Sequence, residues 1–256
     1  MRVHVALTSE DVTGLALDGW SAIAVDVLRA TSTVIAACAA GCARVIPVGT
    51  PDAARLRAGE FAAGEALLAG EQGGEPVPGF ALGNSPLEFT AERVRGRTIV
   101  LSTTNGTRAM LTASAAAAAA AAALTNAGAA AAWALAEGRD VAVLCSGDNG
   151  AFSLEDAVCA GLIAAHLAAV GRAELSGAAR AAVGLGEHYG ARIDQLRTAS
   201  RWARRLARAG RTADLDACLR LDVTDLVPII EAGAFVAGPG ASATARAAAP
   251  RAARRG

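Results

Sequence analysis

The chain has 256 residues, with 24 basic and 24 acidic side chains, and 53% of its residues are hydrophobic. This length predicts a single α/β domain over residues 1–240, and the zero net charge argues against nucleic acid as the main partner. We expect a cytoplasmic protein without a membrane span or a zinc site, because the sequence shows no signal core, no long apolar run and no C-x-x-C pair.

The first predicted strand, residues 23–27, is an apolar run that contains Asp26. A helix is predicted over residues 32–40 with Thr31 or Ser32 as its cap, and a second strand over residues 44–48. An acid within an apolar strand is costly unless it is paired. Asp26 therefore either serves a functional site or forms a buried ion pair with Arg29.

Residues 61–88 are rich in Gly, Pro and Asn and are predicted to form a loop-rich insertion. Interleaved apolar residues such as Val77 and Phe80 favour an ordered segment that packs across the sheet edge and closes a site.

A strand over residues 98–102 is followed by "TTNG" and a helix from about Thr107. Within the alanine-rich stretch that follows, residues 119–124 are predicted to form a short buried strand, although alanine favours helix. The chain has to return across the sheet before the next parallel strand, and a second helix is predicted over residues 127–137.

The last strong strand prediction covers residues 140–145 and precedes the loop "SGDNGAF". Ser153 and Asp156 form a capping-box pattern at the start of the next helix. Beyond residue 240, four arginines predict a disordered basic tail over residues 241–256.

Continuous apolar strands separated by helices predict a three-layer α/β/α fold with a mainly parallel sheet. Ligands bind such sheets at the carboxyl ends of the strands, where three of the predicted loops are small and polar. Helix N-termini at these loops favour an anion, and nearby carboxylates suit Mg²⁺. No P-loop, G-x-G-x-x-G or G-x-S-x-G motif occurs, which argues against the common nucleotide-binding and serine-hydrolase sites.

Four stretches, "VDVLRATST", "GFALGNSPLE", "STTNGT" and "CSGDNGAFSLEDAVCAG", resemble the 2-phosphosulfolactate phosphatases of coenzyme M biosynthesis, and "ADLDACLRLDVTDLVPIIEAGAFV" is a weaker match. The resemblance implies an α/β/α protein that releases phosphate from a small sulfonated, carboxylated ester with the help of Mg²⁺. Gln72 and Ala81 stand where the family tends to carry an arginine and an acid.

The patterns and the resemblance together assign the candidate site residues. We expect Mg²⁺ to be bound by Asp26, Glu71 and Asp156, and catalysis to involve Asp26, Arg29, Asn105 and Asp156. Substrate binding is expected from Thr31, Ser32, Asn84, Ser85, Thr103, Thr104, Gly106, Gly147 and Ser153. Two simpler interpretations stay open: Asp156 can serve only the helix dipole, and Asn84 and Ser85 can be turn residues.

The leading hypothesis is thus a Mg²⁺-dependent phosphatase whose partner is a small phosphate ester, and which can form a homo-oligomer. The alternative is a binding module of the same fold that senses a phosphorylated or sulfonated metabolite without turnover.

Overall fold

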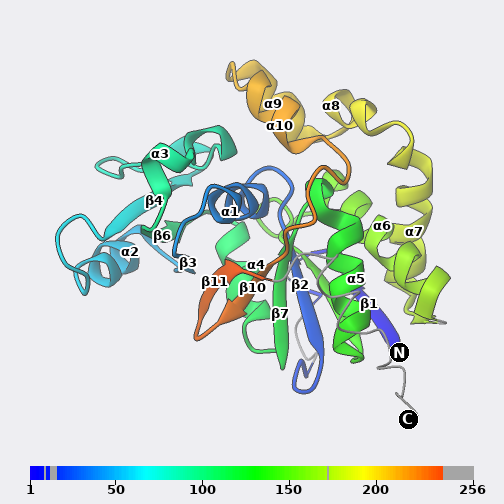
Figure 1. The fold of residues 1–256 in the computed structure, drawn as a ribbon. Coiled ribbons are helices and arrows are strands. Elements are labelled where there is room, and N and C mark those ends of the chain that lie inside the picture. The colour runs from blue at the N-terminus through cyan, green and yellow to red at the C-terminus, as the bar shows by residue number, and fades with distance from the viewer. Residues whose placement is uncertain (9, 12–15, 172, 239–256) are drawn as a thin grey trace, which may run out of the picture.

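A mostly parallel sheet with helices on both faces lies at the centre of the chain (Figure 1). The computed structural model describes residues 1–8, 10–11, 16–171 and 173–238, and the predicted tail over residues 241–256 lies outside them. The three-layer α/β/α prediction is confirmed.

The strands form two parallel groups joined by a hairpin. The first group contains β4 (Ala66–Gln72), β6 (Thr98–Ser102) and β3 (Arg44–Pro47), with the short antiparallel β5 (Glu75–Pro76) at its edge. The second group contains β7 (Ala118–Ala122), β2 (Ser21–Val25), β8 (Val141–Cys145), β1 (Arg2–Ala6) and β9 (Glu174–Leu175). The hairpin of β10 (Pro228–Glu231) and β11 (Ala234–Ala237) pairs antiparallel with β7 and β3.

Two sets of long helices cover the sheet. One face carries α5 (Ala127–Glu137), α6 (Leu154–Gly171) and α7 (Gly177–Gly190), and the other carries α1 (Ala30–Ala39) and α4 (Gly106–Ala113). The shorter helices are α2 (Pro51–Ala58), α3 (Ala91–Val94), α8 (Leu196–Ala199), α9 (Arg201–Arg208) and α10 (Thr212–Cys218), and the 3-10 turns are η1 (Pro86–Glu88), η2 (Leu124–Asn126) and η3 (Ile193–Gln195). Over the described residues, none of these helices combines the length and the apolar character that a membrane crossing requires.

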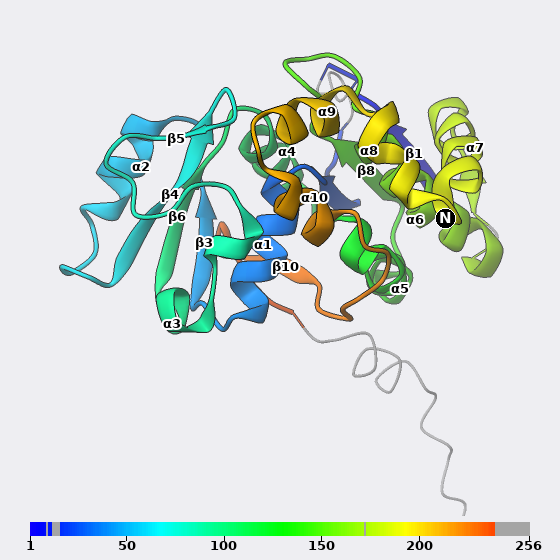
Figure 2. The same cartoon turned by 90° about the horizontal axis from the view of Figure 1, so that it is seen from above.

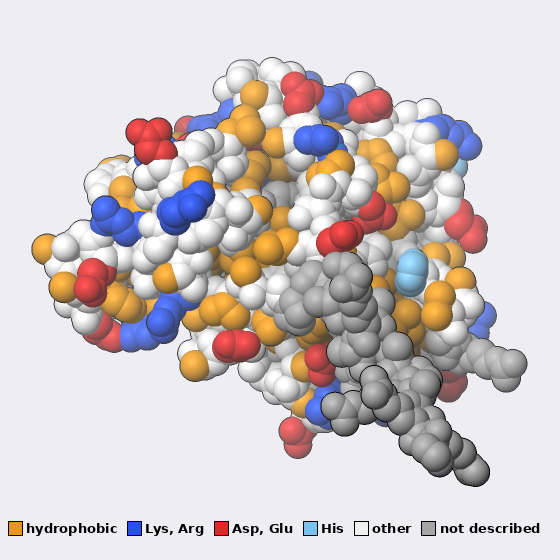
Figure 3. Space-filling model, viewed as in Figure 1, with side chains coloured by type: hydrophobic (Ala, Val, Ile, Leu, Met, Phe, Trp, Pro, Cys, Tyr) orange, Lys and Arg blue, Asp and Glu red, His pale blue; other side chains and the backbone are white. Residues whose placement is uncertain are grey.

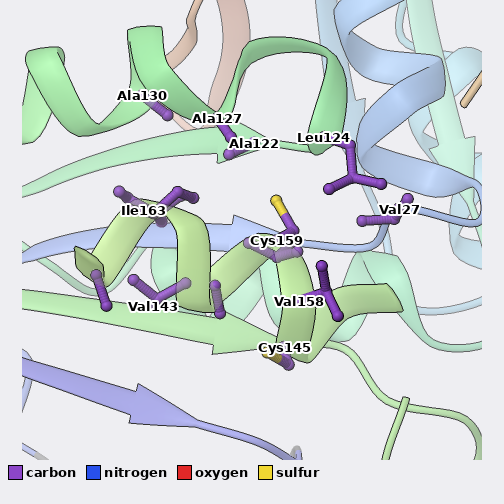
Figure 4. Close-up of a cluster of buried hydrophobic side chains, with 14 of the residues drawn as sticks. Val27, Ala122, Leu124, Ala127, Ala130, Val143, Cys145, Val158, Cys159 and Ile163 are labelled. Carbon is purple, nitrogen blue, oxygen red and sulfur yellow. The ribbon is translucent and has the colours of Figure 1, made fainter. Parts of the chain in front are cut away.

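Side chains that alternate along the strands supply both halves of the core. In β2, Ile23 and Val25 face α5 and α6, whereas Ala22 and Ala24 face α1 and α4. Figure 4 shows Cys159 and Ile163 of α6 above the strands on the first of these faces. Small residues dominate both faces, so the helices can approach the sheet closely.

The alanine-rich strand is confirmed, because β7 pairs in parallel with β2 and lies in the middle of the sheet. Burial and ladder pairing thus outweigh the helix propensity of alanine. Sequence analysis missed β4, which lies inside the predicted insertion and pairs with β6. The cause is Gly70, where a Cβ would lie 1.9 Å from the carbonyl oxygen of Ser102, so close strand contact requires the residue that makes the segment look like a loop.

The contact between α6 and α7 gives a test of this close packing. A Cβ at Gly161 would lie 1.9 Å from the carbonyl oxygen of Ala182, whereas a Cβ at Gly184 meets nothing within 4 Å. We expect Gly161→Ala to lower the free energy of unfolding in urea by about 1–3 kcal/mol through overpacking. The control Gly184→Ala should raise it by up to about 1 kcal/mol through helix propensity. Equal effects of the two substitutions would contradict the backbone contact.

Candidate active site

A polar pocket lies where residues that follow β2, β4, β6 and β8 meet. Five of its lining residues are acids, namely Asp26, Glu71, Asp148, Glu155 and Asp156. Seen from above in Figure 2, α9 and α10 lie across this region, over α1. The predicted convergence of strand ends is therefore present, with a helical segment from the distant C-terminal part placed above it.

Asp26 directly follows β2 and interacts with the start of α1. Its Oδ1 accepts a hydrogen bond from the N–H of Ala30 at 3.0 Å. The prediction that Thr31 or Ser32 caps the helix is wrong, because α1 begins at Ala30 and both hydroxyls donate backwards, to the carbonyl oxygens of Asp26 and Val27. The side chain of Asp26 takes the place of the predicted cap.

The first residue of α4 lies against Asp26 as well. A Cβ at Gly106 would lie 2.3 Å from the Cβ of Ala30 and 2.5 Å from Oδ2 of Asp26. Only glycine allows this approach, which brings the N-termini of α1 and α4 to one carboxylate. Both helix ends favour negative charge there.

The carboxylate of Asp156 bonds to neighbouring loops and not to the N-terminus of its own helix. Its N–H donates to Oγ of Ser153 at 3.4 Å, so half of the predicted capping box is present. Its carboxylate instead accepts from the N–H of Val27 at 2.8 Å and from Ser146 Oγ at 3.1 Å. Asp156 thereby joins the β8–α6 loop to the end of β2, which a residue serving only the helix dipole would not do.

The buried acids repel one another. Burial raises the pKa of Asp26 to about 6 from an ordinary 3.8, and the charges of Glu71 and Glu155 add to the rise. Burial also raises the pKa of Glu155, and it lifts the pKa of Asp156 well above the usual range, with repulsion from Asp26 next in weight. Such a group of carboxyls is stabilised by protons or by a cation.

Arg29 forms a buried ion pair, but its partner is Asp214 of α10 and not Asp26, the partner in the alternative interpretation of the sequence. Nη1 of Arg29 lies 2.5 Å from Oδ2 of Asp214, and Nη2 donates to the carbonyl oxygen of Gly74 at 3.2 Å. Ser85 Oγ donates to the other oxygen of Asp214 at 2.5 Å. One carboxylate therefore joins the β2–α1 turn, the insertion and α10.

Asp214 was missed by the sequence analysis. The available signal was its place in α10: Asp214 and Cys218, four residues apart, share the buried face of that helix. An acid on a buried helical face calls for a cationic partner, although the local sequence does not say which one.

Glu71 and Asn105 hold the loops on the other side of the pocket. The two oxygens of Glu71 accept from the N–H of Thr104 at 2.7 Å and from the N–H of Gly74 at 2.6 Å. Oδ1 of Asn105 accepts from the N–H of Asn149 at 3.0 Å. These bonds fix the β6–α4 loop against both the β4–β5 turn and the β8–α6 loop.

The structure separates the predicted site residues into two sets. Those that line the pocket are Asp26, Arg29, Glu71, Asn84, Thr104, Asn105, Gly147, Ser153 and Asp156. Those that lie outside its lining are Thr31, Ser32, Ser85, Thr103 and Gly106. The second set is buried and supports the walls; Thr103, for example, accepts the N–H of Thr107 at the start of α4.

Two buried oxygen atoms at the pocket have no hydrogen-bond donor among the described residues. They are Oδ1 of Asn84 and Oδ2 of Asp148, whose residues are 5% and 9% exposed. Oδ2 of Asp148 has an ion-pair contact with Arg201, but Nη2 of that arginine lies 3.7 Å away, which is too far for a hydrogen bond. Buried acceptors without a donor are costly, so these two atoms indicate a ligand.

Comparison with known proteins identifies the family to which this chain is similar. The sequence matches the 2-phosphosulpholactate phosphatase family over residues 6–233. A protein of Symbiobacterium thermophilum named probable 2-phosphosulfolactate phosphatase is 38% identical over 86% of this chain and 95% of its own length. Proteins with the same name from Deinococcus radiodurans and Caldanaerobacter subterraneus are 38% and 34% identical, over 83% and 82% of this chain and 88% of each relative.

The raised pKa of Asp26 predicts how stability depends on pH. Its folded-state pKa of about 6 exceeds its ordinary 3.8, so the folded protein binds the proton more tightly, and stability falls as pH rises from about 4 to about 6. With a chelator present at pH 7.5, Asp26→Asn should therefore raise the free energy of unfolding, by up to about 3 kcal/mol for this shift. Thermal unfolding at several pH values measures the change, and exposed Asp52→Asn is the control. A less stable D26N protein would show that the charge itself is needed for folding.

The Arg29–Asp214 pair predicts a large loss of stability on truncation. Asp214→Ala leaves the arginine buried without its carboxylate, and we expect a loss of about 3–5 kcal/mol in the free energy of unfolding. Asp216→Ala, two residues along α10, removes an exposed carboxylate that pairs with Arg197 and should cost at most about 1 kcal/mol. Similar losses for the two variants in urea unfolding would refute the structural role of the buried pair.

Proposed function

The chain belongs to the 2-phosphosulpholactate phosphatase family, and from this premise we propose that it hydrolyses 2-phosphosulfolactate to sulfolactate and phosphate with Mg²⁺ as cofactor. The family supports a phosphatase. The observation that carries the proposal is the excess of carboxyl groups in the pocket.

The pocket has too little positive charge of its own for an anionic ester. Five acids line it, against one arginine among the described residues, and that arginine is already paired with Asp214. A substrate with phosphate, carboxylate and sulfonate groups adds further negative charge. A divalent cation resolves this repulsion, and Mg²⁺ is the ion that prefers carboxylate, amide and phosphate oxygens.

The residues present fit such an ion. Oδ1 of Asn84 and Oδ2 of Asp148, which accept no hydrogen bond, are hard oxygen ligands. Both residues line the same pocket as Asp26, whose pKa is raised by burial and by neighbouring acids. The described residues contain no preformed cluster of three His, Cys, Asp or Glu ligands. Mg²⁺ does not require one, because it binds through one or two carboxylates and keeps waters and substrate oxygens as its other ligands.

We therefore assign the metal to Asp26, Asp148 and Asn84. Of the other two acids predicted as ligands, Glu71 has both oxygens occupied by N–H donors, and Asp156 is occupied by Val27 and Ser146. When bound, the ion would neutralise charge and polarise a phosphoryl oxygen.

The protein's own groups would bind the ester and supply a proton. Arg29 has further N–H donors beyond those used by Asp214 and Gly74, and Asn105 uses its oxygen for Asn149, which leaves its NH₂ group for a phosphate oxygen. Glu155 has a raised pKa, which suits donation of a proton to the oxygen of the departing alcohol.

Water is the nucleophile in this proposal. Cys145 ends a strand near the site, but it is 1% exposed, and burial raises the pKa of its thiol well above the ordinary value. A thiol held in its neutral form is a poor nucleophile. Attack of water on phosphorus breaks the phosphorus–oxygen bond of the ester and gives the alcohol and inorganic phosphate.

Phosphate release from 2-phosphosulfolactate tests the proposal and separates an enzyme from a binding module. We expect turnover with Mg²⁺, loss with a chelator and recovery on addition of Mg²⁺. Asp148→Asn should weaken Mg²⁺ binding, measured by calorimetry, and raise the Mg²⁺ needed for half-maximal activity by about 10–100-fold. Exposed Asp194→Asn is the control. Ester binding without phosphate release in the wild-type protein would support the binding module instead.

A further inference from the structure

The helices α9 and α10, with the intervening turn, form a cap over the pocket (residues 200–218). Trp202 of α9 lines the pocket, and its ring lies against the β4–β5 turn, where two ring carbons are 3.5 Å from the position of a Cβ at Gly74. Arg205 stacks on the same ring at 4.6 Å and donates to the carbonyl oxygen of Gly73 at 2.8 Å. Trp202 thus closes the space between the cap and this turn.

The cap is attached unequally to the rest of the protein. At α10, the carboxylate of Asp214 is buried between Arg29 and Ser85. Other contacts of the cap are exposed: Arg205 donates to the carbonyl oxygen of Gly73, and Arg211, three residues before Asp214, pairs with Glu75, whose side chain is 73% exposed. α9 itself is held in the core by Ala203 and Leu206, which are 0% and 2% exposed. Because the contacts of the Trp202 and Arg205 side chains lie at the exposed edge of the cap, these side chains, and not the helix, are the part that can yield.

The interior of the pocket is narrow when Trp202 is in this position. Its open volume is about 30 Å³, whereas a single water needs roughly 10–15 Å³ counted in the same way. There is room for about two waters, or for an ion and a water, but not for a phosphate ester with an organic group. The acids on the other walls are fixed by bonds to the backbone of neighbouring segments, as shown for Asp156 and Glu71.

We propose that Trp202 is a specificity-determining residue, which limits the size of the group that the phosphate ester carries. The inference rests on the proposed phosphatase function of the same pocket. Trp202 contacts the organic part of the ester, and its side chain yields by rotating away from the β4–β5 turn while α9 and Asp214 stay in place.

Two probes of different size test this role. The ratio of kcat/KM for phenyl phosphate to that for methyl phosphate should rise about tenfold or more in Trp202→Ala, since the size limit is removed. Trp202→Phe should raise the same kcat/KM ratio by a smaller factor. This variant provides the test if Trp202→Ala does not fold. Trp20→Ala is a matched control, because Trp20 also carries a stacked arginine, Arg2 at 5.0 Å, but does not line this pocket. An unchanged ratio in both Trp202 variants overturns the inference.

Binding experiments test the size limit without requiring phosphatase activity. If the wild-type protein hydrolyses neither ester, the same ratio is taken from the Kd values of phenylphosphonate and methylphosphonate, measured by calorimetry with Mg²⁺ present. A gain for the larger phosphonate in Trp202→Ala supports the size limit even when the phosphatase proposal has failed. Equal Kd ratios in the wild-type and Trp202 variants, or no phosphonate binding at millimolar concentration, overturn it.

Discussion

The buried ion pair between Arg29 and Asp214 is the interaction on which the site depends. It joins a strand end to a helix 185 residues further along the chain, and Ser85 of the insertion bonds to the same carboxylate. Because either charge alone would be strongly destabilising when buried, the three segments have to pack together or not at all. The pocket is therefore a product of tertiary assembly, and no single segment contains it.

Small residues make that assembly possible. Gly106 lets α4 approach Asp26, Gly70 lets β4 lie against β6, and the alanines of β7 let helices press on the middle of the sheet. The same closeness removes water from the acids and raises their pKa values, so the packing of the core and the electrostatics of the site have one cause. A cation would relieve the strain that this packing creates.

Local patterns were enough to predict what local chemistry decides. The apolar runs of β2, β6 and β8 and the polar residues that follow them placed Asp26, Asn105 and Asp156 at one edge of the sheet, where they do line one pocket. The position of the cap could not be predicted, because the packing of α9 and α10 over the pocket depends on contacts with segments that are distant in sequence. Arg29 illustrates the limit: the only partner that the sequence analysis considered for it was the neighbouring acid Asp26, whereas the pairing is with Asp214.

The pocket and the cap above it differ in charge. The face in Figure 3 mixes arginines and acids, and the net charge is zero, yet the pocket is rich in acids while α9 carries Arg201, Arg204, Arg205 and Arg208. Arg201 already lies 3.7 Å from Asp148. An anionic ester in the pocket would therefore meet positive charge from α9 as well as from a bound cation. The arginines of the cap and a cation held by the acids would both attract the ester, so electrostatic complementarity to an anion comes from the two sides of the pocket together.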